Sequence, residues 1–162
     1  MKKFDIEKLL ESEYWVIDFL PAQVPAHSGG QFGAVESYLL EGKRKEKLHE
    51  CFAEVIIRLN CYQDIWVTEA RSEDWQKNPA PEKLVEMFCP KKGNAELLIA
   101  VEQGNALISF DSTDSHMTVY NPSSSLKTLL QKLAAGQGLY VWQPAEGKRK
   151  DSEKELRQWR VM

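Results

Sequence analysis

Three short apolar runs lie close together between residues 95 and 120, and they strongly limit what the chain can fold into. The runs are Leu97–Val101, Ala106–Phe110 and Met117–Tyr120. The connections between them are rich in Gly, Asn, Asp and Ser and are only a few residues long, too short for the crossover that parallel strands need. We therefore predict an antiparallel meander in this part of the chain.

Helical periodicity accounts for much of the remaining apolar content. The clearest pattern follows Lys43, where apolar side chains recur at steps of three and four residues from Leu48 to Leu59. This segment is predicted to be a core helix. Shorter helices are expected over residues 3–11, 32–39, 82–88 and 123–135.

Three further runs, rich in aromatic and β-branched residues, are typical of strands: residues 14–20, 64–69 and 139–142. Together with the meander they predict an α+β fold, with a single mixed or mostly antiparallel sheet of about five to six strands flanked by helices. Residues 1–144 are expected to form one domain, and residues 145–162 a charged C-terminal tail or docked helix. A chain of 162 residues is long enough to bury one core of this kind.

Charge, cysteine usage and hydropathy exclude several classes of protein. The net charge of −3 does not favour nucleic-acid binding, and the basic runs at 43–47 and 148–150 leave it only as a weaker alternative. Three cysteines without a C-x-x-C spacing predict neither a disulfide framework nor a zinc ribbon. No apolar stretch reaches the length of a membrane helix. We expect a cytoplasmic protein that has no cofactor and does not bind membranes.

Asp18 is the most unusual polar residue, because it interrupts an apolar strand shortly before Pro21. A buried carboxylate is costly unless it is paired. Asp18 is therefore either an acid–base or ligand group at a strand end, or a carboxylate that faces solvent or caps the following loop. The second interpretation, in which Asp18 has only a structural role, is favoured. If Asp18 is functional, His27 in the 21–31 loop and Glu36 on the next helix are its expected neighbours.

A second polar group, formed by Asp111, Asp114 and His116, superficially resembles a set of metal ligands. Asp, Ser and Thr are also ordinary turn residues, because their side chains hydrogen-bond to nearby backbone groups. The turn is the favoured interpretation. No metal site is predicted, and this group is kept only as an alternative.

Two tryptophans, Trp75 and Trp159, lie in polar surroundings. Trp159 is flanked by Arg157 and Arg160, and exposed aromatic residues beside arginine are typical of protein interfaces. Either ring could instead pack back onto the domain, which is the favoured interpretation for Trp75 and stays open for Trp159. These four residues are the candidate partner-binding residues.

Catalytic signatures such as G-x-S-x-G, H-E-x-x-H and the phosphate-binding loop are absent from the sequence. The leading hypothesis is therefore a non-enzymatic binding or regulatory protein of the bacterial cytoplasm, of the inhibitor or immunity type, whose partner is another protein. A homo-oligomer is also compatible with the sequence. The alternative is a small enzyme or ligand-binding domain whose site lies at the end of the first strand and the 21–31 loop. A deep pocket with Asp18 and His27 facing each other would favour that alternative.

Overall fold

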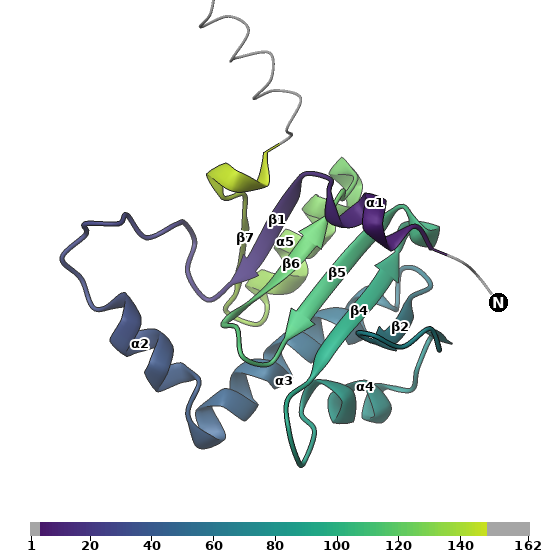
Figure 1. The fold of residues 1–162 in the computed structure, drawn as a ribbon, viewed down its shortest axis with the longest axis horizontal. Helices are drawn as coiled ribbons and strands as arrows, with labels where there is room; N and C mark the ends of the chain where they lie inside the picture. The colour runs from purple at the N-terminus through teal and green to yellow at the C-terminus, as the bar shows by residue number, and fades with distance from the viewer. Residues whose placement is uncertain (1–3, 149–162) are drawn as a thin grey trace, which may run out of the picture.

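A seven-stranded sheet forms the centre of the computed structural model, which describes residues 4–148 (Figure 1). The strand order is β3-β2-β4-β5-β6-β1-β7, and every neighbouring pair is antiparallel. The strands are β1 (Tyr14–Asp18), β2 (Trp66–Glu69), β3 (Gln76–Lys77), β4 (Glu96–Val101), β5 (Ala106–Asp111), β6 (His116–Tyr120) and β7 (Tyr140–Trp142).

The α+β class and the meander are confirmed, but the predicted number of five to six strands is wrong. The additional strand is β3, which consists of two exposed residues at the edge of the sheet. Gln76 and Lys77 pair with Val67 and Trp66 through their backbones. Because such a short edge strand has no apolar alternation, the sequence pattern predicts only a polar loop there.

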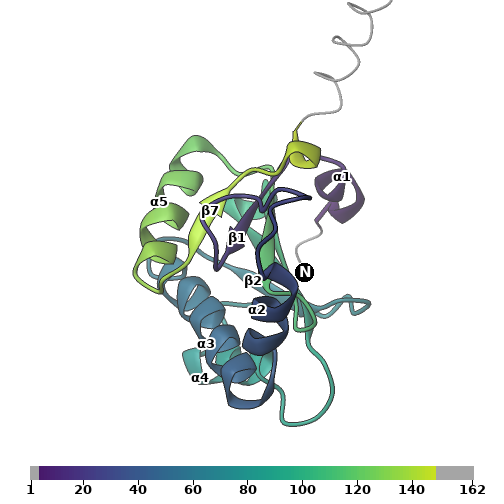
Figure 2. The ribbon, with the colours of Figure 1, turned by 90° about the vertical axis from the view of Figure 1, so that its left-hand side faces the viewer.

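Helices cover the two faces of the sheet unequally (Figure 2). The helices α3, α4 and α5 cover one face, and α1 lies on the other. The α-helices are α1 (Ile6–Leu10), α2 (Phe32–Leu39), α3 (Gly42–Leu59), α4 (Pro81–Phe88) and α5 (Ser124–Ala135). Two short 3₁₀ turns are η1 (Glu102–Gly104) and η2 (Ala145–Gly147).

The main core lies between the sheet and helix α3. Phe52, Ile56 and Leu59 of α3 are fully buried, and they belong to the same apolar cluster as Ile99 and Ile108 of the meander. Burial of side chains of this size contributes about 1.5–3 kcal/mol each. The predicted core helix is thus confirmed, with its apolar stripe against the sheet.

Strand β1 lies between two strands from the C-terminal half of the chain, β6 and β7. Its side chains alternate between the faces, so that Ile17 joins the main core while Val16 and Asp18 face the opposite side. The chain then leaves the sheet in a long loop and returns through α2, which stands away from the sheet (Figure 1). This arrangement leaves a hollow beside β1.

Within residues 4–148, no helix combines the length and the apolar character needed to cross a membrane.

Candidate functional site

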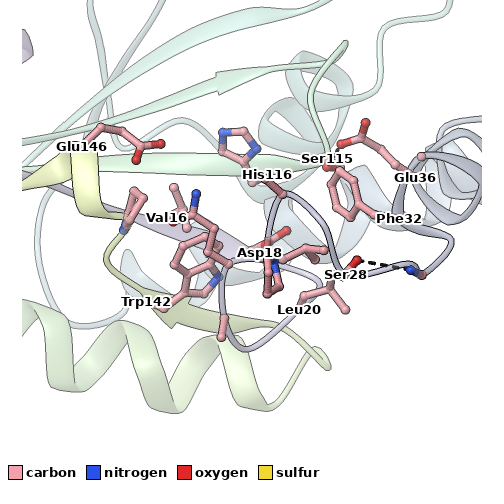
Figure 3. A pocket seen from close by; sticks show the side chains of 18 of the residues that line it. Val16, Asp18, Leu20, Ser28, Phe32, Glu36, Ser115, His116, Trp142 and Glu146 are labelled. Atoms are coloured by element: carbon pink, nitrogen blue, oxygen red, sulfur yellow. Dashed lines mark hydrogen bonds between the residues drawn. The ribbon is translucent and has the colours of Figure 1, made fainter.

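A pocket of about 570 Å³ occupies this hollow, and we call it the β1 pocket (Figure 3). Its floor is the face of β1 that carries Val16 and Asp18, and its other walls come from the 20–30 loop, the first half of α2, the start of β6, and β7 with η2. Three stretches that are distant in the sequence, residues 14–36, 115–116 and 142–146, therefore meet here. Concave sites of this size, with apolar walls and a few convergent polar groups, are the usual form of small-molecule sites.

Asp18 is the most buried acidic residue of the pocket, with 7% of its surface exposed. Its Oδ1 atom accepts a hydrogen bond from the Phe19 backbone N–H at 2.8 Å. Burial raises the pKa of the Asp18 carboxyl, because removal from water penalises the charged form. The Phe19 N–H, the nearby His116 and the Trp142 indole oppose this shift in the Asp18 pKa without reversing it.

The sheet register brings His116 and Trp142 to Asp18. Asp18 lies directly opposite His116 on β6, and Val16 lies opposite Trp142 on β7. The indole Nε1 of Trp142 is buried and close enough to the Asp18 carboxylate to favour its charged form, although it does not reach hydrogen-bond geometry. Asp18 therefore faces a histidine from one neighbouring strand and an indole from the other (Figure 3).

Glu36 reaches the pocket from α2 and is half-buried. Its Oε2 atom accepts a hydrogen bond of 2.6 Å from the hydroxyl of Ser115, a buried residue directly before β6. This bond joins α2 to the sheet across the pocket. At its first turn, α2 is also held by the stacking of Phe32 on Phe19, with ring centroids 6.2 Å apart.

Glu146 of η2 completes the acidic lining at the opposite end of the pocket (Figure 3). Burial raises the pKa of the Tyr14 hydroxyl, and the negative charge of Glu146 adds to this shift. The next residue, Gly147, packs directly on the Tyr14 backbone, where an added Cβ would overlap the carbonyl oxygen. A glycine is thus needed to bring Glu146 this close to β1.

Comparison with known protein families, curated proteins and solved structures finds no match.

The structure brings together only part of the site that the sequence predicted. Asp18 and Glu36 do line one pocket at the end of β1, in the region expected from the sequence. His27 is exposed and does not line it, so the expected pair of Asp18 and His27 is not formed. Asp18 does not face solvent either: it caps the start of the loop through Phe19 and contributes to the pocket floor.

The alternative metal group is not assembled. Within residues 4–148, no three His, Cys, Asp or Glu side chains are arranged to hold a metal ion. Asp111 instead accepts hydrogen bonds from the backbone N–H and the hydroxyl of Thr113, at 2.9 and 2.7 Å, as in an ordinary turn. His116 points to the β1 pocket, and Asp114 is exposed beside it.

Trp75, one of the candidate partner-binding residues, is half-buried and packs edge-on against Phe4, with ring centroids 4.7 Å apart. Its role in partner binding stays a prediction. Arg157, Trp159 and Arg160 lie outside the described residues.

Sequence reasoning missed His116, Trp142 and Glu146 as pocket residues. Trp142 falls within the predicted strand 139–142, and His116 was grouped with Asp111 and Asp114. The proximity of His116 and Trp142 to Asp18 depends on β1 pairing with both β6 and β7, which no local pattern reveals. Val16 and Asp18 are two residues apart, so they lie on the same face of β1. This spacing was a usable signal, because it showed that Asp18 shares a face with an apolar residue.

Proposed function

We propose that the chain is a ligand-binding protein whose site is the β1 pocket. One observation carries this proposal: a single pocket with both apolar and polar walls is lined by the nearly buried Asp18 together with Glu36, His116 and Trp142. Burying a carboxylate costs stability, and functional sites are where proteins typically keep such groups. The site lies in the region named by the alternative hypothesis, that of a small enzyme or ligand-binding domain. We propose that it binds a ligand rather than catalyses a reaction.

The hydrogen bonds around the pocket favour binding. A serine nucleophile needs a base that accepts its proton. Ser115 does donate its hydrogen bond to such a group, the Glu36 carboxylate, but Ser115 is only 2% exposed and has little surface from which to attack a substrate. The bond instead joins α2 to the sheet. The pocket polar groups thus hold its walls together, as expected of a recognition site.

An NMR ligand screen tests this proposal. The chain has five tryptophans, so the indole N–H signals are few, and Trp142→Phe identifies the one from the pocket. We expect ligands from a fragment library to shift the signals of Asp18, Glu36, His116 and the Trp142 indole together. The Trp75 indole, which packs on Phe4 outside the pocket, is the internal control. Hits that cluster elsewhere, or no hits at millimolar concentration, would contradict the proposal.

A protein partner remains the second candidate function, and α2 favours it. No residue of α2 is buried, and Val35 and Tyr38, which lie outside the pocket lining, expose 44% and 56% of their surfaces. Exposed apolar residues three positions apart on a helix are typical of an interaction surface. We propose that a protein partner contacts this side of α2.

Paired variants distinguish this surface from the pocket. Val35→Glu and Tyr38→Glu introduce charge on α2 without altering the pocket lining. A partner captured from cell extract by the native chain should be lost with these variants and retained with Glu86→Gln on the distant helix α4. Retention of the partner by both α2 variants would refute this second proposal.

A further inference from the structure

Three carboxylates from three different elements line the β1 pocket: Asp18 of β1, Glu36 of α2 and Glu146 of η2. No Lys or Arg is among the described residues that line it. Within residues 4–148, Lys and Arg side chains form ion pairs with Glu41, Glu54 and Asp64, but with none of the pocket carboxylates. The local charge therefore attracts cations and repels anions.

The hydrogen bonds already present leave this charge uncompensated. Asp18 accepts a backbone N–H, and Glu36 accepts a hydroxyl. These donors are neutral, so they orient the carboxylates without cancelling their charge. His116, the one residue of the lining that can become cationic, also lies beside Asp114, a further acidic residue outside the lining. The lining of the pocket thus keeps a net negative charge, which a bound cation would neutralise.

The walls indicate what kind of cation fits. The described residues offer no three-ligand metal group, and about 570 Å³ is far larger than a bare ion needs. Three aromatic side chains line the same pocket, those of Tyr14, Phe32 and Trp142. Aromatic faces attract ammonium and guanidinium groups, and they also pack against an apolar body.

We propose that the β1 pocket binds an organic cation, that is, an ammonium or guanidinium group carried on an apolar body. Asp18 and Glu36 receive the positive group, while the aromatic walls enclose the body. This inference rests on the proposed function of the pocket. The same group can be supplied by a free amine or by a Lys or Arg side chain of a partner protein, and the experiment separates the two sources.

Isothermal titration of the full chain with compounds of one shape and different charge tests the inference. Phenethylamine and phenethylguanidine carry the cation, phenethyl alcohol is neutral, and hydrocinnamate is an anion. Capped tripeptides Gly-Arg-Gly and Gly-Lys-Gly, with Gly-Leu-Gly as the neutral control, represent a partner side chain. We expect the cations alone to bind, and binding to weaken as salt is added.

Pocket variants show whether the carboxylates are responsible. Asp18→Asn and Glu36→Gln should each weaken cation binding about tenfold or more, since each removes a charge-assisted contact. Asp74→Asn and Glu86→Gln make the same chemical changes at exposed positions outside the pocket and should leave binding unchanged. Equal losses in all four variants would mean that only the overall charge matters, which overturns the assignment of this pocket.

The remaining outcomes separate this inference from the proposed function. Tighter binding of the amines than of the Arg and Lys peptides assigns a free amine as the source, and the reverse assigns a partner side chain. If the alcohol or the anion binds as well as the amine and shifts the pocket NMR signals, the pocket is a ligand site but the charge inference is wrong. If no compound binds at millimolar concentration and the fragment screen is also empty, both are wrong.

Discussion

At the residue scale, the stability of the fold and the requirements of the site conflict at Asp18. The carboxyl is 7% exposed, and its pKa is raised by burial despite the groups that favour its charged form. A folded-state pKa above the unfolded one means that the folded chain holds the proton more tightly. At neutral pH the charged Asp18 therefore destabilises the fold, and this cost disappears as the pH falls towards the unfolded pKa of 3.8.

Replacing Asp18 by Asn should therefore stabilise the chain while it weakens the pocket. The Asn Oδ1 can still accept the Phe19 N–H, so the turn after β1 is kept. We expect the free energy of unfolding at pH 7 to rise, and the gain to shrink towards pH 4. Urea denaturation at both pH values measures this effect.

Exposed Asp74 provides the matched control, because Asp74→Asn removes a carboxylate that water already solvates. Its stability should change little at either pH. If Asp18→Asn lowers stability at pH 7 instead, the charged carboxylate is part of the structural framework. The conflict between stability and binding would then not exist.

At the element scale, α2 has no fully buried residue, and it is held by a few contacts and by the partly buried Leu39 against the main core. Phe32 stacks on Phe19 at one end, and Arg44 of α3 donates a 2.8 Å hydrogen bond to the Tyr38 carbonyl at the other. Between these two ends of α2, Ser115 donates a hydrogen bond to Glu36 and so joins α2 to the sheet. Elements held by so few contacts open more readily than the core does.

Ser115→Ala should loosen α2 without unfolding the domain. Losing one hydrogen bond to a charged acceptor costs about 1.5–3 kcal/mol, so amide exchange within residues 32–39 should become about ten times faster or more. Exchange in α3 and the meander should stay the same. Thr113→Ala is the control, because its hydroxyl donates a hydrogen bond to Asp111 within the same turn, away from α2. Unchanged exchange in α2 would show that Ser115 does not hold it.

The elements differ in how far the sequence could predict them. The helix from Leu48 to Leu59 and the three meander strands have clear periodicity and short connections, so their type and pairing were predictable. The position of β1 was not, because its pairing with β6 and β7 spans about a hundred residues and leaves no local pattern. The pocket depends on that pairing, and the sequence therefore predicted Asp18 and Glu36 but missed His116 and Trp142.

At the scale of the whole molecule, a histidine lies within the layer between α3 and the meander. His49 of α3 is 3% exposed and meets the Phe110 ring edge-on, with centroids 5.1 Å apart. Its buried Nε2 atom has no hydrogen-bond partner among the described residues. Burial, aided by the charge of Lys45, lowers the pKa of His49 from 6.5 to about 4. The folded molecule therefore requires this imidazole to be neutral.

The whole domain should consequently lose stability in mild acid. A histidine with a lowered folded-state pKa binds fewer protons than in the unfolded chain, so its contribution is complete above pH 6.5 and is lost as the pH falls towards 4. Between pH 7 and pH 5 this single group should lower the free energy of unfolding by about 2 kcal/mol, which urea denaturation can measure. The variant His49→Gln should remove most of that difference, since Gln does not titrate. The variant His27→Gln, at an exposed position, should retain it. An equal acid sensitivity in both variants would place the titrating group elsewhere in the molecule.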